Sequence, residues 1–170
     1  MNYPVWELGW FGGSSLIALI AVVHAFVAQF AVGGGIFLWW LDRRAQTAGD
    51  AELLRYVRRH TSFFLLLTMV FGAVTGVGIW FVIGLVNPAG TSVLIHGFVF
   101  GWAIEWVFFL VEIVALLVYH YQFHRLPGPT RARVAAIYAV AAWLSLVVIN
   151  GILSFMLTPG AWLQTGDFWD

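Results

Sequence analysis

The 170-residue chain has no cysteine and no lysine, and only 9% of its residues are charged. The absence of cysteine excludes disulfides, thiolate metal sites and the attachment motif of c-type haem. Soluble domains carry roughly 25% charged residues, so this composition, with 62% hydrophobic residues, indicates a membrane protein. The formal net charge of zero argues against a nucleic-acid partner.

Basic residues are also absent from Met1–Phe11, a segment rich in aromatic residues. A cleavable signal peptide would carry positive charge there, followed by an apolar core of roughly 7–15 residues. The first apolar run is much longer than that core. We therefore expect it to be a true first membrane helix.

Four long apolar runs predict an all-α fold, an integral membrane four-helix bundle forming a single domain over residues 1–170. The predicted helices cover about 13–41, 61–86, 92–121 and 131–157. A polar loop over 42–60 is expected between the first two. Turn residues with proline and glycine separate the others, and Pro159-Gly160 is expected to end the last helix.

The arginines predict the orientation of the bundle. All eight lie in the connection between the first two helices or around the turn before the fourth. By the positive-inside rule these two connections face the cytoplasm and both termini lie on the outer, periplasmic side. We expect a multi-pass protein of a bacterial or archaeal cytoplasmic membrane, surrounded by lipid.

Two carboxylates, Glu105 and Glu112, interrupt the third apolar run. A charge at the centre of a bilayer costs at least roughly 2.5–3.5 kcal/mol, so such residues usually have a function. A spacing of seven is close to two helical turns, which places both side chains on one face. Three interpretations stay open: a proton path, a ligand or hydrogen-bond partner of a cofactor, or neutral structural glutamates.

His24 is the one histidine that lies well inside a predicted helix. Its alternatives are an axial ligand of haem b or a neutral imidazole bonded to a neighbouring helix. Small residues on its face would admit a flat macrocycle: Ala21, Ala28, Ala31 and Gly35. In the second run, Gly72 and Gly76 indicate either close helix packing or a slot for that macrocycle.

A second haem ligand is harder to identify. His96 lies nearer the helix end and on the opposite face from Glu105, and it could reach a haem only if the helix contained a π-bulge. The position opposite His24 is then vacant or filled by Glu105, Met69, Met156 or another chain. Three further histidines are expected at the arginine-bearing interface, with a metal or quinone-headgroup site as the alternative: His60, His120 and His124.

These residues resemble a known pattern. His24, the segment FGAVTGVGIWF (71–81), the segment IEWVFFLVE (104–112) and the segment INGILSFMLTPGAW (149–162) together resemble the start of subunit I of cytochrome bd quinol oxidase. The resemblance implies that His24 ligates a haem and that Glu105 lies beside one. It also assigns family positions to Gly72, Thr75, Gly76 and the Asn150-Gly151 pair.

The sequence departs from the family in two respects. The family carries another glutamate about eight residues before Glu105, where this sequence has Gly97, with His96 one residue earlier, and Glu112 is additional. The family subunit also continues beyond a fourth helix, where its quinol loop and low-spin haem ligands lie. The resemblance therefore implies a module that works with other subunits, and not a complete quinol oxidase.

Two functions are predicted. The first is a haem b-binding subunit of a respiratory complex, an oxidoreductase only as part of that complex. It would pass electrons between membrane quinol and a partner cytochrome or oxidase, with other membrane subunits, c-type cytochromes and a bound quinone as partners. The second is a cofactor-free membrane anchor. The residues predicted to contact a cofactor are His24, Gly72, Gly76, His96, Glu105 and Asn150; those predicted to carry protons are Glu105 and Glu112.

Overall fold

The computed structural model describes residues 5–158, and all regular secondary structure in this part of the chain is helical. The elements are α1 (Gly13–Ala48), α2 (Ala51–Leu65), a π-helix η1 (Leu66–Gly72), α3 (Ala73–Val86), α4 (Pro88–Gly97), α5 (Val99–Tyr121) and α6 (Gly128–Leu157). Because α2, η1 and α3 are continuous, the described residues contain four helices long and apolar enough to cross a membrane. The predicted all-α architecture with four membrane-length helices is confirmed.

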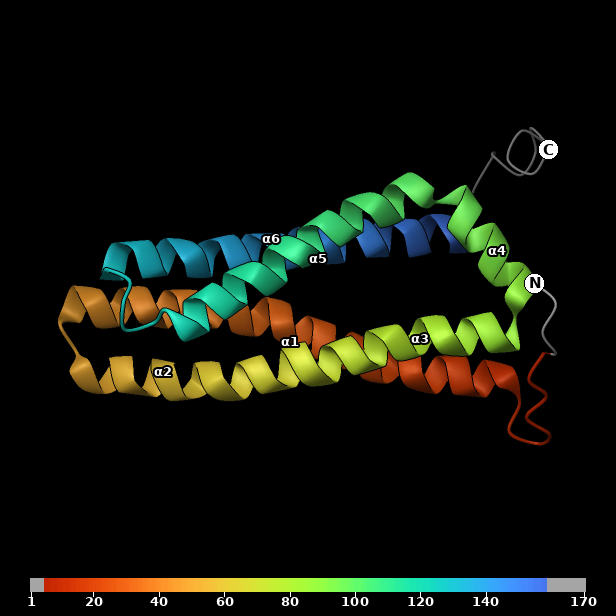
Figure 1. Ribbon diagram of the computed structural model, residues 1–170, viewed down its shortest axis with the longest axis horizontal. Helices are drawn as coiled ribbons and strands as arrows, with labels where there is room; N and C mark the ends of the chain where they lie inside the picture. Colours follow the sequence, from red (N-terminus) through yellow and green to blue (C-terminus); the bar gives the residue numbers. More distant parts are fainter. Residues whose placement is uncertain (1–4, 159–170) are drawn as a thin grey trace.

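The helices run up and down along one long axis (Figure 1). The α1–α2 and α5–α6 connections lie at one end, which we call the arginine end because all eight arginines belong to the segments around it. The α3–α4 turn lies at the opposite, far end. Helix α6 packs along both α5 and α1, and α1 packs against the α2–α3 span. Helices α1 and α6 are therefore the central pair.

The predicted polar loop over 42–60 is wrong. Helix α1 continues to Ala48 and α2 begins at Ala51, so Gly49 and Asp50 alone connect them. Gly49 adopts a left-handed conformation (φ 63°) that ends α1. The Asp50 carboxylate then caps α2 by accepting hydrogen bonds from the backbone N–H groups of Glu52 (3.0 Å) and Leu53 (2.9 Å). Because Gly49 ends α1 and Asp50 caps the start of α2, both helices can extend through the polar sequence between the apolar runs.

The predicted third helix over 92–121 is two helices. Helix α4 begins at Pro88, after Asn87, whose side chain accepts a hydrogen bond from the Gly90 N–H (2.9 Å). It ends at Gly97, and Phe98 (φ −125°, ψ 26°) separates it from α5. Helix α6 likewise starts earlier than predicted, at Gly128, because proline is tolerated in a first helical turn. The predicted stop at Pro159-Gly160 lies outside the described residues.

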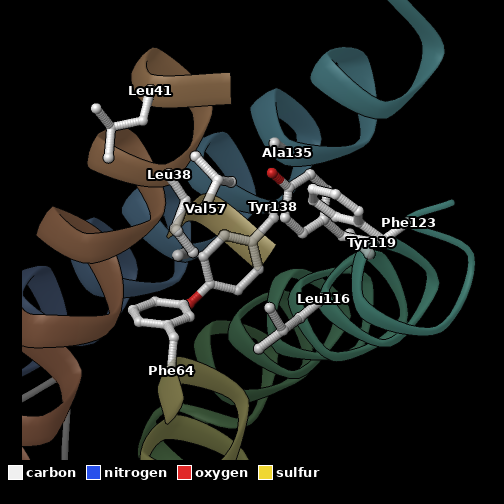
Figure 2. Close-up of a cluster of buried hydrophobic side chains, with 11 residues drawn as sticks. Leu38, Leu41, Val57, Phe64, Leu116, Tyr119, Phe123, Ala135 and Tyr138 are labelled. Carbon is white, nitrogen blue, oxygen red and sulfur yellow. The ribbon is translucent and has the colours of Figure 1, made fainter. Parts of the chain in front are cut away.

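The closely packed core lies in the half of the bundle next to the arginine end. Figure 2 shows side chains of α1, α2, α5 and α6 converging around Tyr138. The Tyr138 ring packs edge-on against Phe64 of α2, with ring centroids 5.6 Å apart. A side chain at Gly34 would collide with Phe64, and one at Gly35 would collide with Tyr138. These two glycines of α1 therefore admit the two aromatic rings that fill the core.

A buried ion pair joins α1 to α6 at this end. Asp42 is fully buried, and Arg131 of α6 donates two hydrogen bonds to its carboxylate, Nε to Oδ2 at 2.9 Å and Nη2 to Oδ1 at 2.7 Å. The Tyr119 hydroxyl of α5 donates a third (3.0 Å) and the Gln46 amide a fourth (2.9 Å). The guanidinium also lies 4.4 Å from the ring centre of Phe123. One carboxylate therefore fixes three helices.

Removing one partner of this ion pair should destabilise the bundle strongly. Arg131→Met leaves Asp42 buried without its cation, which typically costs about 3–5 kcal/mol. The double variant Asp42→Leu/Arg131→Met removes both charges and should be more stable than Arg131→Met alone. Reversible unfolding in detergent of both single variants and the double variant measures the coupling. Additive single-variant effects would contradict a direct interaction.

Candidate functional site

His24 lies in the half of α1 beyond the closely packed core, since α1 has no buried residue before Val27. Its half-buried ring packs against the start of α3, around Thr75 and Gly76. A Cβ atom at Gly76 would lie only 3.0 Å from the Cε1 atom of His24. The glycine therefore provides the surface on which the imidazole lies.

Thr75 of α3 fixes the orientation of this imidazole. The Thr75 Oγ1 atom lies 3.0 Å from Nδ1 of His24. The same hydroxyl donates its one hydrogen to backbone carbonyls, with Phe71 at 2.8 Å and Gly72 at 3.1 Å. A hydroxyl hydrogen directed at these carbonyls favours the tautomer in which His24 donates from Nδ1 and Nε2 keeps its free electron pair. This is the tautomer that binds iron through Nε2, with its other nitrogen held by an acceptor.

A π-helix leads directly into this site. Element η1 ends at Gly72, three residues before Thr75. Such wide turns are frequent at functional sites. A π-bulge was considered above in the third apolar run, where it would bring His96 to a haem; the π-helix lies in the second run instead.

The small-residue face predicted around His24 is only partly available. Ala31 and Gly35 are buried in the α1–α6 contact, and the Tyr138 hydroxyl donates a hydrogen bond to the Ala31 carbonyl (3.2 Å). Ala21 and Ala28 are half-buried, and they lie in the part of α1 that has little core packing. Any flat group beside His24 must therefore lie between Tyr138 and the far end of the bundle.

The two glutamates lie on the α5–α6 contact, on one face as predicted. Ser145 of α6 donates a hydrogen bond to the Glu105 carboxylate (2.8 Å). The Glu112 carboxyl interacts with the hydroxyl of Tyr138, and Glu105 lies close enough to influence it electrostatically. Each carboxyl group thus has a hydroxyl partner on the neighbouring helix.

The contact between Tyr119 and Arg131 continues this arrangement. Tyr119 follows Glu112 by seven residues on α5, and Arg131 precedes Tyr138 by seven residues on α6. The same step of seven separates Glu105 from Glu112 and Tyr138 from Ser145. We call the three contacts the polar ladder: Tyr119 with Arg131, Glu112 with Tyr138, and Glu105 with Ser145. It runs from the buried ion pair at the arginine end into the middle of the bundle.

The other predicted site residues are not brought to His24. His96 is exposed on α4 and its Nδ1 donates to the carbonyl of Ser92 in its own helix (2.7 Å). Asn150 is exposed on α6 and donates to the Leu146 carbonyl (2.7 Å). Neither residue contacts the imidazole, so their roles in cofactor binding stay predictions.

The described residues contain no group of three His, Cys, Asp or Glu side chains that could hold a metal ion, and the histidines near the arginine end make other contacts. His120 contacts the Arg58 guanidinium through Nδ1 (2.8 Å). His60 stacks on Tyr56 instead, with centroids 5.2 Å apart. The interpretation as interface residues fits these positions.

Several residues of the polar contacts were not predicted from the sequence. Asp42 was placed in a loop, and the partners of the glutamates on α6 were not recognised. A signal for them exists: Arg131, Tyr138 and Ser145 repeat at seven residues, as do Glu105, Glu112 and Tyr119. Two polar heptad repeats in adjacent apolar helices predict a shared polar interface.

Comparison with known proteins identifies a family for this chain. The family model described as cytochrome bd terminal oxidase subunit I matches residues 15–166, nearly the whole chain. No curated protein and no solved structure matches significantly. The family match covers the His24 site and the complete polar ladder, and the chain therefore belongs to the cytochrome bd terminal oxidase subunit I family.

Proposed function

We propose that this chain is a haem b-binding subunit of a quinol-oxidising respiratory complex, with His24 as an axial iron ligand. The observation that carries the proposal is the 3.0 Å contact between His24 Nδ1 and Thr75 Oγ1, because a hydrogen-bond partner at Nδ1 orients the imidazole and would leave Nε2 for a metal. The residues at this position fit a haem. His24 provides an imidazole ligand, and the part of α1 before Val27 has no side chain buried in the core that would occupy the space of a macrocycle. The match to an oxidase family supports the same assignment.

A haem would supply one-electron chemistry at this position. The chain's own residues would do the rest. His24 would hold the iron, Thr75 would keep the imidazole in its binding tautomer, and Gly76 would keep the ring seated on α3. Electrons would pass between membrane quinol and a partner cytochrome or oxidase chain, with a quinone as second cofactor and other membrane subunits as partners.

The polar ladder would serve proton transfer. Carboxyl and hydroxyl groups can hold and relay protons, and those of Glu112, Tyr138, Glu105 and Ser145 lie in line along the α5–α6 contact. The line begins at the arginine end, which we propose faces the cytoplasm by the positive-inside rule. Protons taken from that side would then reach the middle of the membrane without a free charge in lipid.

The alternative function is a cofactor-free anchor subunit. It is favoured by one observation. Thr75 already provides a hydrogen-bond partner for His24, and the imidazole packs against Gly76, without any cofactor. In that case the polar ladder would only join α5 to α6. The variants below distinguish the two functions.

The orientation is tested by single-cysteine labelling, since the chain has no cysteine of its own. Ala48 ends α1 at the arginine end and Ala89 lies in α4 at the far end, and both are exposed. A membrane-impermeant maleimide should label Ala89→Cys in intact cells and Ala48→Cys only after permeabilisation. Labelling of Ala48→Cys from outside would invert the proposed topology.

Glu105→Gln should lower the turnover of the assembled complex while the protein still inserts and folds. Glutamine keeps the shape and can still accept from Ser145, but it cannot carry a proton. Glu112→Gln should act in the same direction. Ile104→Leu, on the exposed side of α5, is the control. Unchanged turnover in both glutamine variants would leave the glutamates a structural role.

His24→Ala should lose one haem and its spectral signature. Ala28→Phe, one turn along α1, should obstruct the same haem without touching its ligand. Thr75→Val removes the acceptor of the Nδ1 hydrogen bond and should weaken haem retention by about 10–100-fold. His96→Ala, which changes an exposed histidine, should leave the spectrum unaltered.

The haem complement per chain, with the visible spectrum of each purified variant, provides the measurement. Full haem content and an unchanged spectrum in His24→Ala would refute ligation at this position. If neither the wild-type chain nor any variant contained haem, the result would instead favour the cofactor-free anchor subunit.

A further inference from the structure

Gln29 has no partner in the part of the chain that the structure describes. It lies in α1 thirteen residues before Asp42 and sixteen after Gly13, near the middle of the apolar span. Its side chain is exposed, which in a membrane means exposed to lipid. A carboxamide in hydrocarbon lacks the hydrogen bonds that water would give it, so it is costly unless another group covers it.

Gly33 lies one turn further along the same side of α1, and no packing contact among the described residues requires a glycine there. A Cβ atom at Gly33 would meet nothing within 4 Å, whereas side chains at Gly34 and Gly35 would collide with the core. Glycine inside a helix is unfavourable relative to alanine. In membrane helices it is tolerated where another backbone approaches closely.

Both residues belong to one exposed stripe of α1. Val22, Phe26, Gln29, Gly33, Ile36 and Trp40 are all exposed and follow one another at alternating steps of four and three residues. This is the periodicity of a helix seam that packs along another helix. The stripe faces away from the core contacts of Gly34 and Gly35, so a helix docked there would leave the described bundle unchanged.

We propose that this stripe is the interface with a second copy of the chain, with two α1 helices crossing at Gln29 and Gly33. A carboxamide carries both donors and an acceptor, so two glutamines can satisfy each other. A two-fold axis along the membrane normal puts the same residue of both copies at the same depth, as an isologous interface requires. Gly33, one turn away, lets the backbones come close enough for the amides to meet.

Disulfide cross-linking in membranes tests the pairing, because the chain has no other cysteine. Ile36→Cys lies on the stripe and should form a covalent dimer on oxidation, since a disulfide needs Cα atoms within about 7 Å. Val140→Cys on α6 is the matched control for random collisions. Val140 is similarly exposed, at 55% against 47%, and lies as far from the start of α6 as Ile36 from the end of α1.

Gln29→Leu and Gly33→Leu, each combined with Ile36→Cys, should both reduce the cross-link to the control level. Leucine at these exposed positions suits lipid, so insertion and monomer folding should be preserved, which circular dichroism and thermal unfolding verify. The proposal is overturned if Ile36→Cys cross-links no better than Val140→Cys, the result expected if lipid or a different subunit covers Gln29. A cross-link that survives Gln29→Leu would equally overturn it.

Discussion

The bundle depends on one buried ion pair. Asp42 of α1, Arg131 of α6 and Tyr119 of α5 meet at the arginine end, and the carboxylate accepts four hydrogen bonds there. Such a pair contributes little net stability compared with apolar packing, but it tolerates few alternative arrangements. It therefore fixes the register of the three helices. The aromatic core around Tyr138 lies next to the ion pair, on its side towards the far end. Gly34 and Gly35 leave the space that the rings of Phe64 and Tyr138 occupy in that core.

That register determines where the chemistry can lie. With Tyr119 beside Arg131, steps of seven residues bring Glu112 to Tyr138 and Glu105 to Ser145. The carboxyl groups thus lie between helices, where hydroxyl groups replace water. Close packing ends there, and His24 of α1 lies further towards the far end, where its ring contacts α3. The fold accordingly separates a tightly packed half, which contains the ion pair, from a less tightly packed half, which carries the imidazole.

The sequence predicted the helical architecture and the common face of the glutamates, because both follow from long apolar runs and helical periodicity. It did not predict the helical extensions over 42–60, since polarity alone does not reveal that Gly49 and Asp50 form a complete cap. It assigned Gly35 to the face of His24, whereas the structure fills that position with Tyr138. Periodicity tells which residues share a face, but it does not tell which side chain of another helix occupies that face.

The central claim is that this member of the cytochrome bd terminal oxidase subunit I family binds haem b through its own His24. The visible absorption spectrum of the purified chain, oxidised and then reduced, tests it most directly. The account predicts a Soret band, a b-type pyridine haemochrome and a reduced form that binds carbon monoxide. The four other histidines all lie in the described residues, and their contacts there are with groups other than His24, so none of them fills the opposite position. A well-folded chain, supplied with haem during expression and still without a Soret band, would contradict it.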